Sequence, residues 1–379
     1  MSRALVAYRR APQRKTIKPV ANTTDLAPMQ PASRKRVLEE LAGMSPAYFG
    51  MVMATGIVSL GAHFLAWPWI AQMLFKLNVL AYAVLWSLSL WRAVAHPRLF
   101  FGDMIDHLRG PGFFTTVAAT AILGGQFIVL GADLITGATL LALATLLWVG
   151  LTYTIFAGFT IKEVKPTLDK GINGAWLLAV VATQSIAVLS ALIAPHVGQP
   201  GKLELNFVAL SMWLWGGMLY IWMMSLIFYR YTFFRLAPSD LTPPYWINMG
   251  AMAISTLAGS LLILNVSDAP FLLSLLPFIK GFTVLYWATG TWWIPMLLVL
   301  ALWRHVYKRF PLTYDPLYWG AVFPLGMYAA STDRMIEAMG FSFLTFLPIT
   351  FFYAALIAWS IVFLGLVRDL LRRARGLWR

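Results

Sequence analysis

Long apolar runs recur along most of this chain, and short polar segments separate them. A helix of about 20 mostly apolar residues crosses a hydrocarbon core of about 30 Å. Backbone polar groups within lipid must find partners inside their own segment, so we expect each run to be an α-helix. The pattern predicts ten membrane spans, at 46–65, 70–94, 112–131, 134–159, 174–194, 206–235, 244–266, 272–303, 316–338 and 342–367. The predicted fold class is therefore an all-α polytopic membrane protein.

The connections between the runs differ in charge, and this difference predicts the orientation. Four are polar and basic: His96–Arg109, Thr160–Gly171, Leu236–Pro243 and Arg304–Asp315. The others are short or weakly charged: Ala66–Trp69, Ala132–Asp133, Pro195–Leu205, Ser267–Phe271 and Gly340–Phe341. Of the 29 Lys and Arg residues, all but Lys76, Lys202, Lys280 and Arg334 lie on the side of the basic connections and the tails. By the positive-inside rule, we expect both termini to lie in the cytoplasm. We expect the chain to be a multi-pass protein of the inner or plasma membrane.

The two ends of the chain differ from its apolar middle. Residues 1–44 are rich in Lys, Arg and Pro and lack the apolar region of a secretory signal, which predicts a disordered, basic cytoplasmic tail. Two alternatives are a short amphipathic surface helix at 33–44 and an organelle transit peptide. Residues 45–370 form the predicted ten-helix membrane domain, and residues 371–379 form a second basic cytoplasmic tail.

The spacing of the spans indicates an internal repeat. The odd spans begin near Pro46, Gly112, Gly174, Pro244 and Pro316, at intervals of 62 to 72 residues. Gly and Pro gather near the starts and middles of the odd spans, whereas the even spans are rich in Trp. We therefore predict five helical hairpins, with a quasi-fivefold inner ring of odd helices around a central pore. The alternative is that Gly and Pro are simply common in membrane helices.

Composition excludes several classes of function. The chain has no cysteine, so it forms no disulfide, thiolate metal site or cysteine nucleophile. The net charge is +14, and the basic residues lie between the apolar runs and in the two tails. This distribution argues against nucleic acid as a partner. Gly110-Pro111-Gly112 lacks the Lys and Ser/Thr of a phosphate loop, and the histidines lack metal-ligand spacing. We expect no enzyme, no metal site and no cofactor.

Three motifs carry a resemblance to a known family. They are Ser45–Gly56 (SPAYFGMVMATG), Pro243–Ile247 (PPYWI) and Tyr318–Gly326 (YWGAVFPLG). Over about residues 45–370 the chain resembles the tellurite-resistance/dicarboxylate transporter family. This family includes bacterial TehA anion channels, plant slow anion channels, yeast sulfite pumps and fungal malate permeases. The resemblance implies five hairpins around a central pore and a homotrimer with one pore per protomer.

The resemblance also implies a pore gate. The family places a gating phenylalanine just before a proline in the ninth span, and Phe323 and Pro324 match these positions. Val322 stands where a threonine is common in the family. Four residues after an aromatic near each odd-span start come Met53, Ala118, Val180, Gly250 and Phe323. These five are the candidate constriction ring, which Phe323 would close; the alternative for Phe323 is a packing role.

Polar groups within the spans are few. The candidate pore-lining hydroxyls are Thr55, Ser59, Thr115, Thr116, Ser255 and Thr332; the alternative for each is a bond back to its own helix. Asp333, Arg334 and Glu337 lie near the outer end of the ninth span, as an interfacial charged cap or in a solvated vestibule. The lack of mid-span charge suits a weakly selective pathway, because conduction needs weak binding.

These observations predict a channel or channel-like transporter for small inorganic or organic anions. The alternative is a proton-coupled carrier of C4-dicarboxylates such as malate, or of sulfite or tellurite-related oxyanions. A receptor or scaffold with a vestigial pore is a rival from another class. The expected partners are a small anion, the lipid bilayer and further copies of the chain in a homotrimer.

Overall fold

The protein is a bundle of long helices. The computed structural model describes the backbone of residues 39–377 and side chains as far as Arg373, and every regular element in that range is helical. The long helices are α2 (Gly50–Phe64), α3 (Pro68–Ala95), α5 (Phe114–Gly131), α6 (Leu134–Ile161), α8 (Leu178–Ile193), α9 (Gly201–Phe233), α10 (Ile247–Leu264), α11 (Pro270–Leu302), α12 (Trp319–Met339) and α13 (Phe346–Leu377). The predicted N-terminal tail lies mostly outside the described residues.

Nine of the described helices are long and apolar enough to cross a membrane. They correspond to nine of the ten predicted spans, and the largest difference in a boundary is at the C-terminal end of the last one, which was predicted at 367 whereas the helix α13 continues to Leu377. The remaining predicted span, 316–338, is the helix α12, which carries Asp333, Arg334 and Glu337 in its last two turns. The ten-span count therefore stays a prediction.

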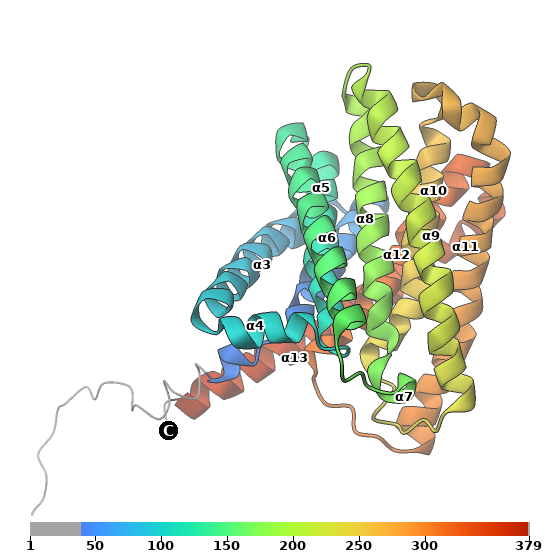
Figure 1. The fold of residues 1–379 in the computed structure, drawn as a ribbon. Helices are drawn as coiled ribbons and strands as arrows, with labels where there is room; N and C mark the ends of the chain where they lie inside the picture. The colour runs from blue at the N-terminus through green and yellow to red at the C-terminus, as the bar shows by residue number, and fades with distance from the viewer. Residues whose placement is uncertain (1–38, 378–379) are drawn as a thin grey trace, which may run out of the picture.

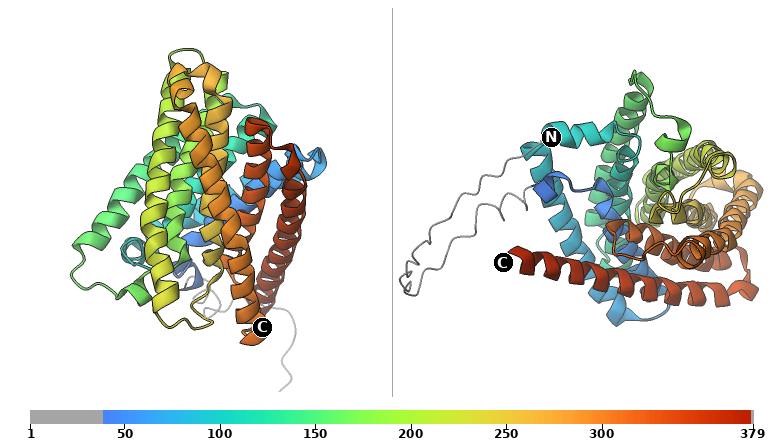
Figure 2. Two further views of the ribbon diagram at one scale, coloured as in Figure 1. Left: turned by 90° about the vertical axis from the view of Figure 1, so that its right-hand side faces the viewer. Right: turned by 90° about the horizontal axis from the view of Figure 1, so that it is seen from below.

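The connections lie at two ends of the bundle. Figure 1 shows the link between α8 and α9 at one end, and the short helices α4 (Pro97–Met104) and α7 (Leu168–Gly171) at the other. We call the end with α4 and α7 the basic end, because the predicted basic connections lie there, and the opposite end the far end. The right-hand view of Figure 2 looks at the molecule from the basic end and shows α13 running across the view and extending past the bundle.

Burial divides the long helices into two sets. Between 72% and 94% of the apolar stretch of α2, α5, α8 and α10 is buried, and α12 is buried along most of its length. In α3, α6, α9, α11 and α13 the buried share is only 22% to 50%. We call the first five the inner helices and the second five the outer helices. Each inner helix contacts the next one along the chain, and α12 contacts α2.

Each inner helix begins with a short 3-10 turn at the basic end. The five turns are Pro46–Phe49, Gly110–Phe113, Gly174–Leu177, Pro243–Trp246 and Pro316–Tyr318. Proline is tolerated there because the first N–H groups of a helix have no partner within it. Ser45, Asn173 and Asp315 cap three of the turns, each by accepting a hydrogen bond from the backbone N–H two residues ahead. Each turn contacts the next, and the last contacts the first.

Glycine allows the turns and helices to approach closely. A Cβ on Gly174 would lie 2.6 Å from the Cα of Tyr245 in the turn before α10, so only glycine fits there. A Cβ on Gly250 of α10 would lie 2.8 Å from Cγ of Pro324 in α12. Small residues at such crossings let membrane helices pack backbone against backbone.

Hydrogen bonds join each outer helix to the inner helix that follows it. The indole N–H of Trp148 in α6 donates to the hydroxyl of Thr183 in α8, and that of Trp287 in α11 donates to Thr332 in α12. Tyr82 of α3 and Thr120 of α5 share a hydrogen bond between their hydroxyls, and the indole N–H of Trp213 in α9 donates to the carbonyl of Ser255 in α10. The indole N–H of Trp359 in α13 donates to the hydroxyl of Thr55 in α2, the first inner helix. These bonds matter because buried aromatic N–H and O–H groups need a partner.

Candidate functional site

Two cavities lie in series along the five inner helices. Each is lined by residues from all five of them or from their 3-10 turns. The first, the basic-end cavity, is lined by the first halves of the helices, and the second, the far-end cavity, by their second halves. Because all five helices run from the basic end to the far end, the cavities share one axis through the bundle.

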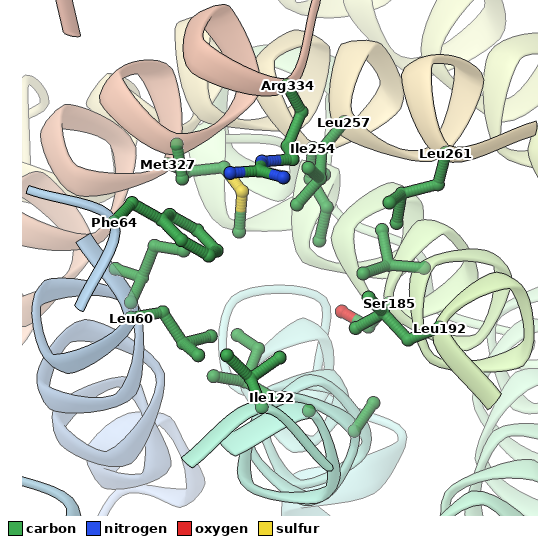
Figure 3. A pocket seen from close by; sticks show the side chains of 16 residues that line it. Leu60, Phe64, Ile122, Ser185, Leu192, Ile254, Leu257, Leu261, Met327 and Arg334 are labelled. Carbon is green, nitrogen blue, oxygen red and sulfur yellow. The ribbon is translucent and has the colours of Figure 1, made fainter. Parts of the chain in front are cut away.

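The far-end cavity is almost entirely apolar. Its volume is about 50 Å³, which leaves room for a few water molecules. Its lining is Ile57, Leu60, Phe64, Ala121, Ile122, Gly125, Val129, Ser185, Val188, Leu192, Ile254, Leu257, Leu261, Met327, Ala330 and Arg334. Figure 3 shows these side chains facing a common space, with the guanidinium of Arg334 at its edge.

The basic-end cavity is smaller, at about 20 Å³ by the same measure. It is lined by Ala47, Gly50, Met53, Thr115, Leu178, Pro244, Ile247, Leu317, Trp319, Gly320 and Phe323. Ala47 and Leu317 also line a wider, polar space of about 320 Å³ at the basic end. The cavity is thus a short vestibule that continues toward the basic end of the protein.

A layer of apolar side chains separates the two cavities. Met53 is the deepest lining residue of the basic-end cavity on α2, and Phe323 is the deepest on α12. One helical turn further on, Ile57 and Met327 already line the far-end cavity. Both Met53 and Phe323 are 1% exposed, so neither cavity opens widely past them.

The candidate constriction ring is only partly gathered around the cavities. Phe323 and Met53 face the basic-end cavity together. Ala118 and Val180 are fully buried and line neither cavity. Gly250 lies against the ring of Pro324, where it serves the contact between α10 and α12. On α5, α8 and α10 the residues that line the basic-end cavity are instead Thr115, Leu178 and Ile247.

Most of the candidate hydroxyls lie away from the cavities. Thr55 and Thr332 accept indole N–H groups from the outer helices α13 and α11. Ser59 donates to the carbonyl of Ala71 in α3, and Thr116 lines a separate space beside α3 and α6. The Ser255 hydroxyl donates to Ala251 within its own helix. Thr115 is the candidate that lines a cavity, and it donates to the carbonyls of Gly112 and Pro46.

Two polar residues line the far-end cavity: Ser185, which the pattern did not select, and Arg334, which it placed in a charged cap or a solvated vestibule. Ser185 lines the far-end cavity while its hydroxyl donates to the carbonyl of Val181. Arg334 lines the same cavity and pairs with Asp333 and Glu337. Ser185 lies one turn beyond Val181 on a helix without a polar face, so no periodicity marked it. The signal for Arg334 was its place in a span, which charges rarely occupy.

Among the side chains that the structure describes, no group of three or more His, Asp or Glu could hold a metal ion. The described linings of both cavities contain no Asp, Glu or His either. The arrangement is a pair of small, mostly apolar cavities on one axis, with Phe323 and Met53 at the inner end of the basic-end cavity.

Comparison with known proteins agrees with this picture. Residues 43–367 match the model of a family described as voltage-dependent anion channels. Two uncharacterized transporters of Methanocaldococcus jannaschii are 27% and 26% identical to this chain; the matches cover 83% and 86% of this chain and 91% and 92% of the relatives. An uncharacterized membrane protein of Mycobacterium tuberculosis is 38% identical over 152 residues, which is 40% of this chain and 77% of that protein.

Proposed function

Because this chain belongs to the voltage-dependent anion channel family, we propose that it conducts small anions along the axis of its five inner helices. The observation that carries the proposal is the pair of coaxial cavities, each lined by all five inner helices. Each inner helix contacts the next along the chain, and the last contacts the first. In this proposal the five inner helices therefore form a quasi-fivefold ring around one pore, and the ten long helices form five hairpins.

The electrostatics of this path favour anions that bind weakly. Five helix N-termini, with their partial positive charge, meet at the basic end. Beyond them the described lining carries one charged side chain, Arg334. A fixed charge in a narrow pore would retain an anion, whereas conduction needs binding that is easily reversed. Helix dipoles and an apolar wall fit this requirement.

Phe323 is the gate in this proposal. Its ring stands between the two cavities, where an apolar constriction raises the barrier by excluding water. Pro324 lies inside α12 and removes one backbone hydrogen bond, which lets the helix bend at the gate. Met53 completes the apolar layer from α2.

The assembly and location follow the same proposal. The bilayer surrounds the outer helices, whose exposed aromatic side chains include Trp215, Trp222 and Trp292. We place the basic end in the cytoplasm and the chain in a homotrimer with one pore per protomer; the trimer rests on the family resemblance. Residues 45–370 are the channel domain and 371–379 a basic tail in this proposal.

A proton-coupled carrier of malate or oxyanions is the rival. Such a carrier needs a titratable group on the substrate path. The described linings of the two cavities hold no Asp, Glu or His. The nearest acids lie at the two mouths of the path, Glu40 and Asp315 at the basic end and Asp333 and Glu337 at the far end, and not along its narrow part. This disfavours the carrier relative to the channel.

Planar-bilayer recording of the purified protein tests the proposal. Wild type and Phe323→Ala are recorded with nitrate, chloride or malate, with and without a pH gradient. We expect anion currents whose reversal potential follows the anion gradient, ignores the pH gradient, and ranks nitrate above chloride above malate, because weakly hydrated ions lose less on entering an apolar pore. Transport that requires protons, a preference for malate, or no current from either protein would overturn it.

A further inference from the structure

We propose that Arg334 recruits anions at the far-end mouth of the pore and sets the preference for anions over cations there. The inference rests on the proposed channel function and adds a selectivity residue to it. Of the described residues that line the far-end cavity, Arg334 is the one with a charged side chain. Figure 3 shows its guanidinium at the edge of the cavity, above apolar side chains from the other inner helices.

The surroundings of Arg334 hold its charge beside the cavity. The guanidinium carbon lies 4.5 Å from the centre of the Phe64 ring, which is also part of the lining. This cation–π contact fixes the planar group against α2 without consuming its hydrogen bonds. The side chain is 27% exposed, so an ion arriving from the far end can reach it. Its Nε is buried and lacks an acceptor among the described residues.

Two carboxylates pair with the guanidinium from outside the cavity, so the three side chains together carry a net charge of −1. Nη2 lies 3.0 Å from Oδ2 of Asp333, and Nη1 lies 2.5 Å from Oε2 of Glu337. Both acids line other surfaces than the far-end cavity, and their side chains are 35% and 52% exposed. Exposed ion pairs of this kind are weak. An incoming anion can therefore compete with the carboxylates for the guanidinium and leave again.

This arrangement differs from that of the other cations assigned to the far side. Lys76 and Lys280 are exposed on the outer helices α3 and α11 and line neither cavity. Lys202, in the first turn of α9, pairs with Asp268 in the connection between α10 and α11. A cleft with low-dielectric walls concentrates the field of a charge placed in it. Arg334 has such walls around it, whereas the exposed lysines lie on the outside of the bundle.

The effect of Arg334 should depend on ionic strength. Screening acts over about 30 Å at 0.01 M salt but about 8 Å at 0.15 M. We expect Arg334→Gln to raise the far-side anion concentration for half-maximal current by about tenfold in low salt, because focusing of counter-ions in a cleft is worth at least about that factor. The saturating current should change little. The anion-to-cation permeability ratio should fall.

The test compares variants in the Phe323→Ala background, so that gating does not limit the current. Lys280→Gln is the matched control, since it removes one far-side positive charge outside the cavity, and it should leave both readouts unchanged. Arg334→Lys keeps the charge and should restore the permeability ratio. If Arg334→Gln behaves like Lys280→Gln, the inference fails while the proposed function stands. If neither the wild type nor any Phe323→Ala variant conducts anions, the proposed function itself fails.

A second variant covers the case in which Arg334→Gln does not fold. Asp333→Asn/Glu337→Gln removes both competing carboxylates and leaves the guanidinium in place. We expect this double variant to lower the half-saturating anion concentration and raise the permeability ratio. An unchanged or lower ratio would overturn the role of Arg334 independently of the first variant.

Discussion

Phe323 is the residue on which the gate proposal depends, and its replacement separates gating from packing. Phe323→Ala should join the two cavities and increase the anion current several-fold, because the aromatic layer between them is lost. Phe114 is equally buried, at 1% exposed, but lines neither cavity, so Phe114→Ala is the matched control. That change should cost about 3–5 kcal/mol of stability and add no current.

Bilayer current and thermal unfolding in detergent, measured for both variants, decide the outcome. A Phe323→Ala protein that is strongly destabilised and conducts no better than wild type would show that Phe323 is a packing residue and that the barrier lies elsewhere.

The direction of individual side chains is what the sequence could not predict. The inner helices are apolar all round, so no polar face indicates which hydroxyl meets the pore. Thr115 lines a cavity while its neighbour Thr116 faces the outer helices, one residue or about 100° further round. Thr55 and Thr332 serve tryptophans of the outer helices. A buried indole N–H needs an acceptor. This need could have indicated that threonines of the inner helices bind tryptophans of the outer helices.

The elements themselves were more predictable than the side chains. Long apolar runs with short polar breaks leave few choices for a chain in lipid, so the span boundaries were close to the observed helices. The short helices α4 and α7 were not predicted, because each is only 8 or 4 residues long and lies within a polar connection. Gly and Pro at the starts of the odd spans marked the positions of the 3-10 turns, but their geometry was not predicted.

Gly250 tests how closely two inner helices must approach. A Cβ there would lie 2.8 Å from the rigid ring of Pro324, so Gly250→Val should force α10 and α12 apart. Overpacking of this kind costs about 1–3 kcal/mol. Gly281→Val on α11 is the matched control, since a Cβ at Gly281 has nothing within 4 Å. Thermal unfolding in detergent should show a loss for Gly250→Val only, and equal stability of the two variants would contradict this close contact.

At the scale of the whole molecule, the cations of the basic end have a structural role as well as a charge. Several cations at the basic end bind backbone as well as facing water: Arg92 Nε donates to the carbonyl of Ala42, and Arg230 Nε donates to that of Asp169. Each joins the end of an outer helix to a segment earlier in the chain. The charges counted by the positive-inside rule therefore also fasten the basic end, which no count of charges could have predicted.

Whether α12 crosses the membrane decides the side on which the chain ends. Its residues before Asp333 form an apolar stretch of 14 positions, about 21 Å at 1.5 Å per residue, which is short for a lipid-facing span. However, α12 contacts α2, α10, α11 and α13, so protein covers much of it and its charges sit at the far end. We therefore expect α12 to span, which makes ten spans and places both termini on one side.

Topology reporters measure this directly. Gly198 lies in the α8–α9 connection with nothing within 4 Å of a Cβ there, so an inserted reporter should be tolerated. We expect reporters at the N-terminus and the C-terminus to be cytoplasmic and the one at Gly198 to be outside, because five spans separate Gly198 from each terminus. If α12 did not cross, only nine spans would remain and the two termini would lie on opposite sides. A C-terminal reporter on the same side as Gly198 would thus remove both the ten-span count and the five-hairpin pore built on it.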